Sequence, residues 1–236
     1  MCEDIKPKEV FVEELFSSIA PKYDFLNSLL SFGIHKAWRA YAVKCCRLSS
    51  GDAALDVAAG TCDLAIRLSK SVGRDGRVVA VDFCRPMLEM GKKRIEKLNI
   101  KNVEVLFGNA KALPAEADTF QASITGFALR NVDDIPAALR EMARVTVPGG
   151  RVVLLELAKP EGPVFGRLYN FYFERMLPVI GGAISRRFKP YKYLPASLKS
   201  FCSREEIAQM MIEAGLHDIS IHNLTGGIAA VHVGVK

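Results

Sequence analysis

From residue 53 onward, short apolar runs alternate with segments long enough to form helices, and this alternation limits the fold more than any other feature. The runs that predict strands lie at 53–58, 77–82, 103–107, 121–125 and 151–157. The helix-length segments lie at 63–72, 86–98, 134–145 and 163–177. Strands that alternate with helices in this way predict a parallel sheet that is covered by helices on both faces.

The end of the chain departs from this alternation. Residues 205–215 predict a helix that is closed by Gly215. The apolar runs 219–224 and 228–235 then flank the turn 225–227 (Thr-Gly-Gly), which is a hairpin signal. We therefore expect the last two strands to pair antiparallel, which gives an α/β fold with a seven-stranded, Rossmann-like sheet.

Residues 1–50 contain no strand signal. Two amphipathic stretches within them, 8–19 and 36–47, predict helices. We expect these helices to form a cap over the carboxyl edge of the sheet, where open α/β folds bind their ligands. The chain contains no linker, internal repeat or low-complexity segment. The cap and residues 51–236 are therefore expected to form one domain.

Composition excludes several classes of protein. The N-terminus carries no readable secretory signal, and the most apolar run, 176–184, is far too short to span a bilayer. The six cysteines form no CxxC pair and have no histidine at zinc-ligand spacing, so we expect reduced thiols and no metal site. These features predict a cytoplasmic protein. The net charge of +6 allows an anionic membrane surface or a phosphate group as a partner.

The turn after the first strand has the features of a cofactor site. Asp56 ends the strand, and residues 58–61 (Ala-Ala-Gly-Thr) have so little side-chain bulk that a ligand can approach the backbone. Gly60 is the only glycine there, which disfavours the pyrophosphate of a dinucleotide. Asp63 suits the N-cap of the next helix and tolerates the cationic amino group of S-adenosylmethionine. Cys62 is expected to be a packing residue, whose Cβ is accommodated if its φ angle is negative, and a reactive thiol is the alternative.

Two further signals follow the next two strands. Asp82 ends the second strand, where a carboxylate can accept hydrogen bonds from ribose hydroxyls. Asn109 follows the third strand and can present its amide to the edge of an adenine, while Ala110 leaves room for the ring. Because these residues lie at the ends of successive strands, they predict an adenosyl cofactor at the carboxyl edge of the sheet.

The stretch YDFLNSLLSFGIHKAW, from Tyr23 to Trp38, closely resembles the signature of the ubiquinone/menaquinone biosynthesis C-methyltransferases. The matching residues are Tyr23, Asp24, Asn27, Ser31, His35 and Trp38. Leu26 departs from the signature, which usually has methionine there. The similarity continues at 127–134, 144–160, 191–198 and the closing LTGGIAAVHVGVK, so it covers nearly the whole chain.

The resemblance implies a class I S-adenosylmethionine-dependent methyltransferase that methylates a ring carbon of a polyprenylated quinol. The family substrates are demethylmenaquinol and a 2-polyprenyl-methoxy-benzoquinol. We favour demethylmenaquinol, although the residues do not separate the two. By this resemblance, the cofactor-binding positions of the family correspond to Thr61, Asp82, Asn109 and Ala110. Some relatives carry a serine that faces the cofactor where this chain has Gly126.

The ring carbon becomes a good nucleophile only when a neighbouring hydroxyl loses its proton, so the site needs a base or a cation that stabilises a phenolate. Arg130 is the candidate for the cation, and the alternative is that it merely pairs with an aspartate at 133–134. Tyr23 and Asp24 are candidates to position or deprotonate the hydroxyl. His35 is a further candidate base, or a structural hydrogen-bonding residue.

Two structural roles are considered for the other aromatic residues. Trp38 and Phe32 are expected to belong to the core rather than to a substrate platform. The segment 163–194 combines aromatic side chains with the basic run 186–193, which suits a membrane interface, although packing between cap and sheet is the alternative. Besides the quinol, the expected partners are the inner face of the cytoplasmic membrane, as a peripheral contact, and a second copy of the chain in a homodimer.

Three other functions stay open on the residues alone. A nucleic-acid methyltransferase would suit the basic residues between 186 and 192. However, methylation of an exocyclic amine usually needs an Asn/Asp-Pro-Pro-aromatic motif, and this chain has TGFALRN after the fourth strand, so no nucleic acid is expected. The others are a non-catalytic protein that binds an adenosyl ligand and a methyltransferase that acts on another phenolic small molecule.

Overall fold

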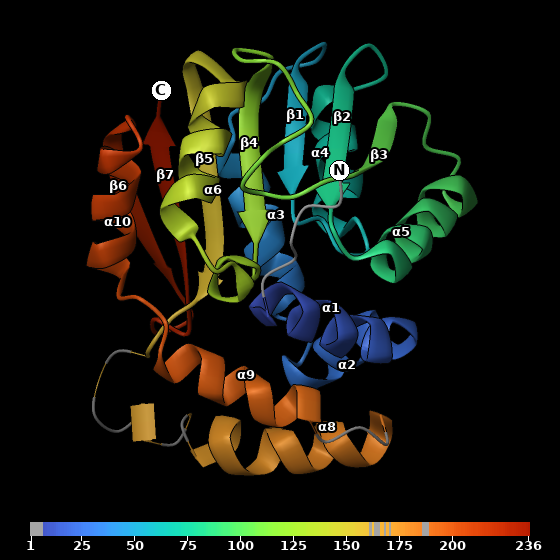
Figure 1. The fold of residues 1–236 in the computed structure, drawn as a ribbon, viewed down its shortest axis with the longest axis vertical. Helices are drawn as coiled ribbons and strands as arrows, with labels where there is room; N and C mark the ends of the chain where they lie inside the picture. Colours follow the sequence, from blue (N-terminus) through green and yellow to red (C-terminus); the bar gives the residue numbers. More distant parts are fainter. Residues whose placement is uncertain (1–6, 161, 163–165, 168, 170, 186–188) are drawn as a thin grey trace.

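The computed structural model describes residues 7–160, 162, 166–167, 169, 171–185 and 189–236. Within them, seven strands form one sheet in the order β3-β2-β1-β4-β5-β7-β6 (Figure 1). The strands are β1 (Ala53–Val57), β2 (Arg77–Asp82), β3 (Val103–Phe107), β4 (Phe120–Gly126), β5 (Thr146–Leu157), β6 (His217–Leu224) and β7 (Ala229–Val235). Strands β1 to β5 run parallel, and β7 pairs antiparallel with both β5 and β6. The predicted sheet and its terminal hairpin are confirmed.

Helices cover both faces of this sheet. One face packs against α3 (His35–Cys45), α4 (Asp63–Val72) and α5 (Arg85–Lys97). The other face packs against α6 (Ile135–Val145) and α10 (Arg204–Glu213). Strand β2 illustrates why both faces are apolar, since Val78 and Ala80 enter the first core and Val79 and Val81 enter the second.

A helical cap lies beyond the carboxyl ends of β1, β2 and β4 (Figure 1). It comprises α1 (Pro7–Ile19), η1 (Ala20–Lys22), α2 (Tyr23–Leu30), the π-helix η3 (Tyr172–Met176), α8 (Leu177–Ser185) and α9 (Lys189–Lys199). A small core of its own, with Leu26 of α2 packed among Phe173, Leu177 and Leu198, joins the two halves of the cap. The cap therefore comes from two segments of the chain that are far apart in the sequence.

The structure corrects some predictions about the elements. The stretch 36–47 forms α3, but it packs on a face of the sheet and not over the edge. The predicted strand 151–157 begins earlier, at Thr146. The predicted helix 163–177 lies partly outside the described residues, and its described end is the π-helix η3.

No helix among the described residues is both long enough and apolar enough to cross a membrane.

Candidate functional site

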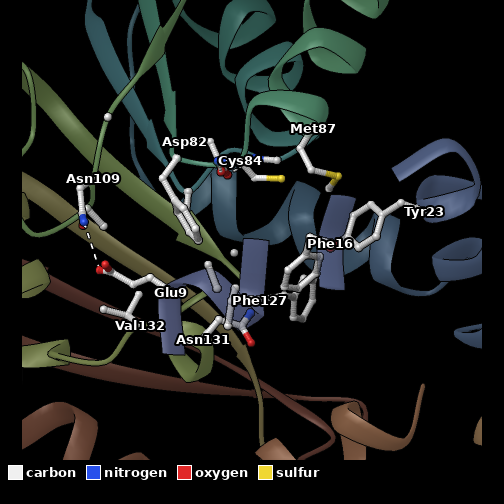
Figure 2. Close-up of a pocket in the computed structure, with 18 residues that line it drawn as sticks. Glu9, Phe16, Tyr23, Asp82, Cys84, Met87, Asn109, Phe127, Asn131 and Val132 are labelled. Carbon is white, nitrogen blue, oxygen red and sulfur yellow. Dashed lines mark hydrogen bonds between the residues drawn. The ribbon is translucent and has the colours of Figure 1, made fainter. Parts of the chain in front are cut away.

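Two cavities lie between the carboxyl edge of the sheet and the cap. The small cavity has a volume of about 80 Å³ and is lined by the segments that follow β1, β2 and β3, by the end of β4 and by α1 (Figure 2). The large cavity has a volume of about 730 Å³ and is lined mainly by the cap, α3 and the β6–β7 turn. Tyr23 and Phe127 line both cavities. The two spaces therefore meet at these two aromatic rings.

The turn between β1 and α4 has an unusual backbone. Ala58, Gly60 and Cys62 all have φ angles in the left-handed region, at 55°, 55° and 61°. The φ angle of Cys62 is positive, so the condition under which its Cβ would be accommodated without strain is not met. Cys62 is fully buried, and its thiol occupies the space that a Cβ on Gly91 of α5 would need. A glycine at position 62 would adopt this left-handed conformation at lower cost, but it would lack the thiol that packs against α5.

Asp63 is the first residue of α4, and Cys62 is its N-cap, so the predicted N-cap role of Asp63 is also wrong. Asp63 instead forms ion pairs with Arg39 at 3.3 Å, Arg67 at 3.5 Å and Arg94 at 3.1 Å. Burial of Asp63 disfavours its ionisation, but the three guanidinium groups outweigh burial and lower its pKa. Asp63 therefore ties α3 and α5 to the start of α4.

Asp82 lies at the wall of the small cavity, as predicted. Its Oδ1 accepts a hydrogen bond from the Cys84 N–H, and its Oδ2 accepts one from the Gly60 N–H, both at 2.7 Å. Burial raises the pKa of Asp82, although these backbone donors oppose the rise. Each carboxylate oxygen keeps a second lone pair, so the group can also accept hydrogen bonds from a ligand in the cavity.

Asn109 and Ala110 also line the small cavity. The Asn109 Nδ2 donates to Glu9 Oε1 of α1 at 3.2 Å, a bond that crosses the cavity wall in Figure 2. The same Glu9 oxygen lies 2.6 Å from the Lys111 ammonium, which also pairs with Asp133 at 2.8 Å. These contacts hold α1 against the segment that follows β3.

Two predicted cofactor residues lie away from the cavities. Asp56 is buried beneath the turn, where its Oδ2 accepts a hydrogen bond from the Ala65 N–H at 2.8 Å. Burial raises the pKa of Asp56 to about 8. Thr61 is buried as well, and its hydroxyl donates to Asp24 Oδ1 at 2.7 Å. The structure brings neither residue to the lining of a cavity, and their contact with a cofactor stays a prediction.

The residues of the small cavity fit an adenosyl cofactor. The Asp82 carboxylate and the Asn109 amide supply acceptors and donors at two neighbouring strand ends. Ala58, Gly60, Gly108, Ala110 and Gly126 keep part of the wall free of side-chain bulk. A Cβ at Gly126 would lie 2.8 Å from Leu64 Cδ1. The serine found at this position in some relatives would therefore require Leu64 to move.

The large cavity is mainly apolar. Its aliphatic and aromatic walls include Leu30, Leu157, Phe173, Leu177, Leu194 and Ile228. Trp38 is buried at the cavity wall, as expected for a core residue, and its indole N–H donates to the Thr225 hydroxyl at 2.9 Å. Phe32 is 84% exposed at the rim of the cavity, so the prediction that it belongs to the core is wrong.

Arg130 is the predicted catalytic residue with the most distinctive surroundings. It lines the large cavity from η2 (Leu129–Asn131), the short helix after β4. Its Nη1 donates to Glu156 Oε2 of β5 at 2.8 Å, and both side chains are almost fully buried. The alternative of a pair with Asp133 or Asp134 is wrong, because Asp133 pairs with Lys111 and Asp134 caps α6.

The other three predicted catalytic residues differ in whether their side chains line a cavity and have a free polar group. Tyr23 lies where the two cavities meet. Asp24 lines neither cavity, and its carboxylate binds Thr61 and Arg94. His35 lines the large cavity, but both of its ring nitrogens have partners, Ser28 at 3.1 Å and Arg39.

The protonation state of His35 follows from these surroundings. Burial and the neighbouring Arg39 guanidinium lower the pKa of His35 to about 4, so its ring is neutral near pH 7. Because Arg39 donates to Nδ1, the proton of the neutral ring is on Nε2, which donates to Ser28. No ring nitrogen is left to act as a base in this arrangement.

Several site residues carried no signal in the sequence. Glu9 reaches the small cavity only because α1 folds over it, and Glu156 looked like one more residue of a buried strand. Arg94 connects the cap to the turn, since its Nη1 donates to Asp24 at 3.0 Å and to the Thr61 carbonyl at 2.9 Å. Such pairings form between residues far apart in the chain, so local patterns do not reveal them.

Comparison with known proteins agrees with the geometry. The sequence profile of the ubiE/COQ5 methyltransferase family matches residues 4–236. The demethylmenaquinone methyltransferase of Halalkalibacterium halodurans is 45% identical over 229 residues, which are 97% of this chain and 94% of that protein.

Solved structures agree with the architecture. A SAM-dependent methyltransferase from Thermotoga maritima has a TM-score of 0.66 at 20% identity, and the match covers 94% of this chain and 99% of that one. The [4+2]-cyclase SpnF has a TM-score of 0.70 at 14% identity, over 95% of this chain and 94% of that one. Since a cyclase shares the architecture, these structural matches establish the fold and not the reaction.

Proposed function

The chain belongs to the ubiE/COQ5 methyltransferase family, and we propose that it transfers the methyl group of S-adenosylmethionine to a ring carbon of demethylmenaquinol. S-adenosylmethionine is the cofactor of this methyltransferase. The choice of acceptor rests on the relatives that are named demethylmenaquinone methyltransferases.

The observation that carries the proposal is the pair of cavities that meet at Tyr23 and Phe127. The small cavity offers the polar groups that an adenosyl moiety needs, and the large cavity offers apolar walls for an aromatic ring with a prenyl chain. When bound, the cofactor supplies an electrophilic methyl group. Tyr23 and Phe127 would border the path of transfer and exclude water from it.

Arg130 would stabilise the ionised acceptor. Its guanidinium stays charged at any physiological pH, so it cannot take the proton of the quinol hydroxyl. It can lower the pKa of that hydroxyl, as it does for the cavity residue Tyr169, whose pKa burial raises and the Arg130 charge lowers. The hydroxyl ionises more readily beside this fixed charge, and the ring carbon becomes more nucleophilic.

The roles of Asp24 and His35 as bases have less support. The Asp24 carboxylate is bound to Arg94 and Thr61, and both nitrogens of the neutral His35 ring are bound. We propose that Asp24 joins the cap to the cofactor turn and that His35 braces the wall of the large cavity.

Methyl transfer from labelled S-adenosylmethionine tests the function. The purified protein is incubated with reduced demethylmenaquinol, with the demethylated benzoquinol and with simple phenols. We expect labelled menaquinol to be the main product. If labelled benzoquinol is the main product instead, the protein acts in ubiquinone biosynthesis. Cofactor binding without label in either quinol would refute the quinol assignment and favour another phenolic acceptor.

We also propose that the cap makes a peripheral contact with a membrane. Four large apolar side chains of the cap are unusually exposed, namely Phe25 at 61%, Phe32 at 84%, Phe171 at 55% and Val179 at 62%. Phe32 lies at the rim of the large cavity, so a prenyl chain that leaves the bilayer would enter beside Phe32. The net charge of +6 favours an anionic inner leaflet. A homodimer stays a prediction.

A further inference from the structure

The Arg130–Glu156 pair has features that the proposed reaction does not by itself require. Glu156 lines neither cavity and lies behind Arg130 at the end of β5. Its side chain is 2% exposed and that of Arg130 is 7% exposed. A buried charge pair is costly to form, so its presence beside a substrate cavity calls for a reason other than stability.

Among the described residues, every hydrogen bond of the Glu156 carboxylate is with the segment that carries Arg130 or with its own strand. Oε1 accepts a hydrogen bond from the Leu129 N–H at 2.8 Å. Oε2 accepts one from Arg130 Nη1 at 2.8 Å and one from the Leu157 N–H at 3.2 Å. Glu156 therefore fixes both the backbone before Arg130 and one corner of its guanidinium.

The rest of the guanidinium is available to a ligand. Within the described part of the chain, Glu156 is the only group that binds Arg130, and the Arg130 Nε is buried without a partner. A guanidinium has five N–H donors in a rigid fork, so one nitrogen can be held while the others face an acceptor oxygen. An oriented donor beside a substrate cavity is what the stabilisation of a phenolate needs.

We infer that Glu156 is a positioning residue, which holds Arg130 in the orientation that stabilises the ionised hydroxyl of the acceptor. This inference rests on the proposed function. Titratable or charged groups that line the same cavity or act on Arg130 are Tyr23, His35, Arg39, Tyr169, Tyr172 and Tyr193. Tyr172 and Tyr193 donate their hydroxyl hydrogens to Leu30 and Asn131, and none of these six described groups forms a hydrogen bond with Arg130. Among the described residues, Glu156 alone therefore fixes the orientation of Arg130.

The test compares Glu156→Gln, Arg130→Met and the double variant in the labelled methyl-transfer assay. Arg130→Met should lower kcat about 100-fold, as expected when an oriented donor to a developing anion is lost. Glu156→Gln should lower kcat about tenfold with little change in KM, because orientation and not binding is lost. The double variant should be no slower than Arg130→Met, because Glu156 acts through Arg130.

The pH dependence separates this role from a structural one. The rise of kcat with pH reports the ionisation of the acceptor hydroxyl in the complex. Its midpoint should move to higher pH in Arg130→Met, which removes the positive charge, and in Glu156→Asp, which keeps both charges but withdraws the carboxylate that orients Arg130. A loss of folded protein would lower kcat at every pH and leave the midpoint in place.

Two further variants serve as controls for the effect of Glu156→Gln. Glu141→Gln is the matched control, because Glu141 also binds one arginine, Arg144 at 2.6 Å, and one backbone N–H, that of Leu113 at 2.8 Å, but lines neither cavity. Its kcat should equal that of the wild type. Glu156→Asp, which keeps the charge but withdraws the carboxylate, should also lower kcat, and it replaces Glu156→Gln in that comparison if Glu156→Gln does not fold.

A wild-type kcat in Glu156→Gln, or a wild-type midpoint and kcat in Glu156→Asp, would overturn the inference. So would additive losses in the double variant. Failure of the proposed function looks different, because the wild-type protein itself would then leave both quinols unlabelled.

Discussion

Cys62 and Gly91 lie against each other where the cofactor turn meets α5, and each limits what the other can be. A methyl group on Gly91 would overlap the Cys62 thiol. We therefore expect Gly91→Ala to lower the free energy of unfolding by about 1–3 kcal/mol, the usual cost of overpacking a core. Cys62→Gly removes the obstacle, and the double variant should regain most of the loss. Urea unfolding of the cycle measures this coupling.

Cys62→Ala separates the effect of the thiol from the effect of the left-handed backbone conformation at position 62. It removes the thiol but keeps a Cβ at a φ of 61°, whereas Cys62→Gly also relieves the left-handed conformation. Cys62→Gly should therefore be more stable than Cys62→Ala by about 1 kcal/mol. Strictly additive effects at positions 62 and 91 would contradict the packing argument.

His35 links stability to pH. Its pKa in the folded protein is about 4, against an ordinary value of 6.5, so between these values the unfolded chain binds a proton that the folded chain does not. The free energy of unfolding should therefore fall as the pH decreases from about 6.5 to about 4. His35→Gln should flatten this dependence in urea titrations at a series of pH values.

Part of the change of the free energy of unfolding with pH (the slope) will persist in His35→Gln, because burial also lowers the pKa of His232 to about 4. The matched control is His217→Gln, which replaces an exposed histidine of β6 and should keep the wild-type slope. An unchanged slope in His35→Gln would show that the ring takes up its proton in the folded state.

At the residue scale, the sequence predicted site residues that follow strands and missed those that depend on packing. Asp82 and Asn109 line the small cavity because the carboxyl ends of parallel strands share one edge. Asp56 also ends a strand, but its carboxylate turns under α4 and binds the Ala65 N–H. Which way a side chain turns at a strand end depends on the neighbouring helix, and no local pattern records that.

Among the helices, α10 begins with a complete capping box. The Ser203 hydroxyl accepts a hydrogen bond from the Glu206 N–H at 3.1 Å, and the Glu206 carboxylate accepts one from the Ser203 N–H at 2.7 Å. Ser203→Ala should lower the free energy of unfolding by about 1 kcal/mol. Ser200→Ala, at the end of α9, is the control and should change stability by less than about 0.5 kcal/mol. Equal effects of the two changes would rule out a special role for the cap.

Glu9 is one of the residues that hold helix α1 over the small cavity. Its carboxylate binds the Lys111 ammonium at 2.6 Å and the Asn109 amide at 3.2 Å. Glu9→Gln removes the ion pair, so the backbone amides of residues 8–19 should exchange with deuterium faster than in the wild type. Glu14→Gln, at an exposed position of the same helix, should leave the exchange unchanged. Equal exchange in both variants would mean that apolar packing alone holds α1.

At the element scale, regular patterns predicted regular elements. The bounds of β2, β3 and α4 agree with the prediction because each is a single apolar or amphipathic run. Helix α9 was not predicted, and it contains Pro195 in its interior, where proline usually ends a helix. Helix α2 was also missed, since it has only eight residues and no side-chain cap at its start.

The whole molecule is asymmetric, with its most exposed apolar side chains in the cap. We expect Phe25→Ser combined with Val179→Ser to weaken binding to vesicles of phosphatidylglycerol by about tenfold or more, since each side chain would contribute over 1 kcal/mol when inserted. Sedimentation with the vesicles measures the bound fraction.

The matched control removes two equally exposed apolar side chains elsewhere. Leu98 follows α5 and is 56% exposed, and Ile212 lies on α10 and is 53% exposed. Leu98→Ser combined with Ile212→Ser should leave vesicle binding unchanged. Equal losses in both double variants would mean that general hydrophobicity, and not the cap, governs the membrane contact.

The lining of the large cavity has a consequence for synthesis on the ribosome. The cavity needs Tyr23 near one end of the chain and Ile228 near the other, together with cap helices from the middle. An emerging polypeptide can build β1 to β5 in order, but it has no acceptor cavity until the terminal hairpin pairs with β5. Apolar residues of the early segment must therefore wait for their partners until this hairpin has been synthesised.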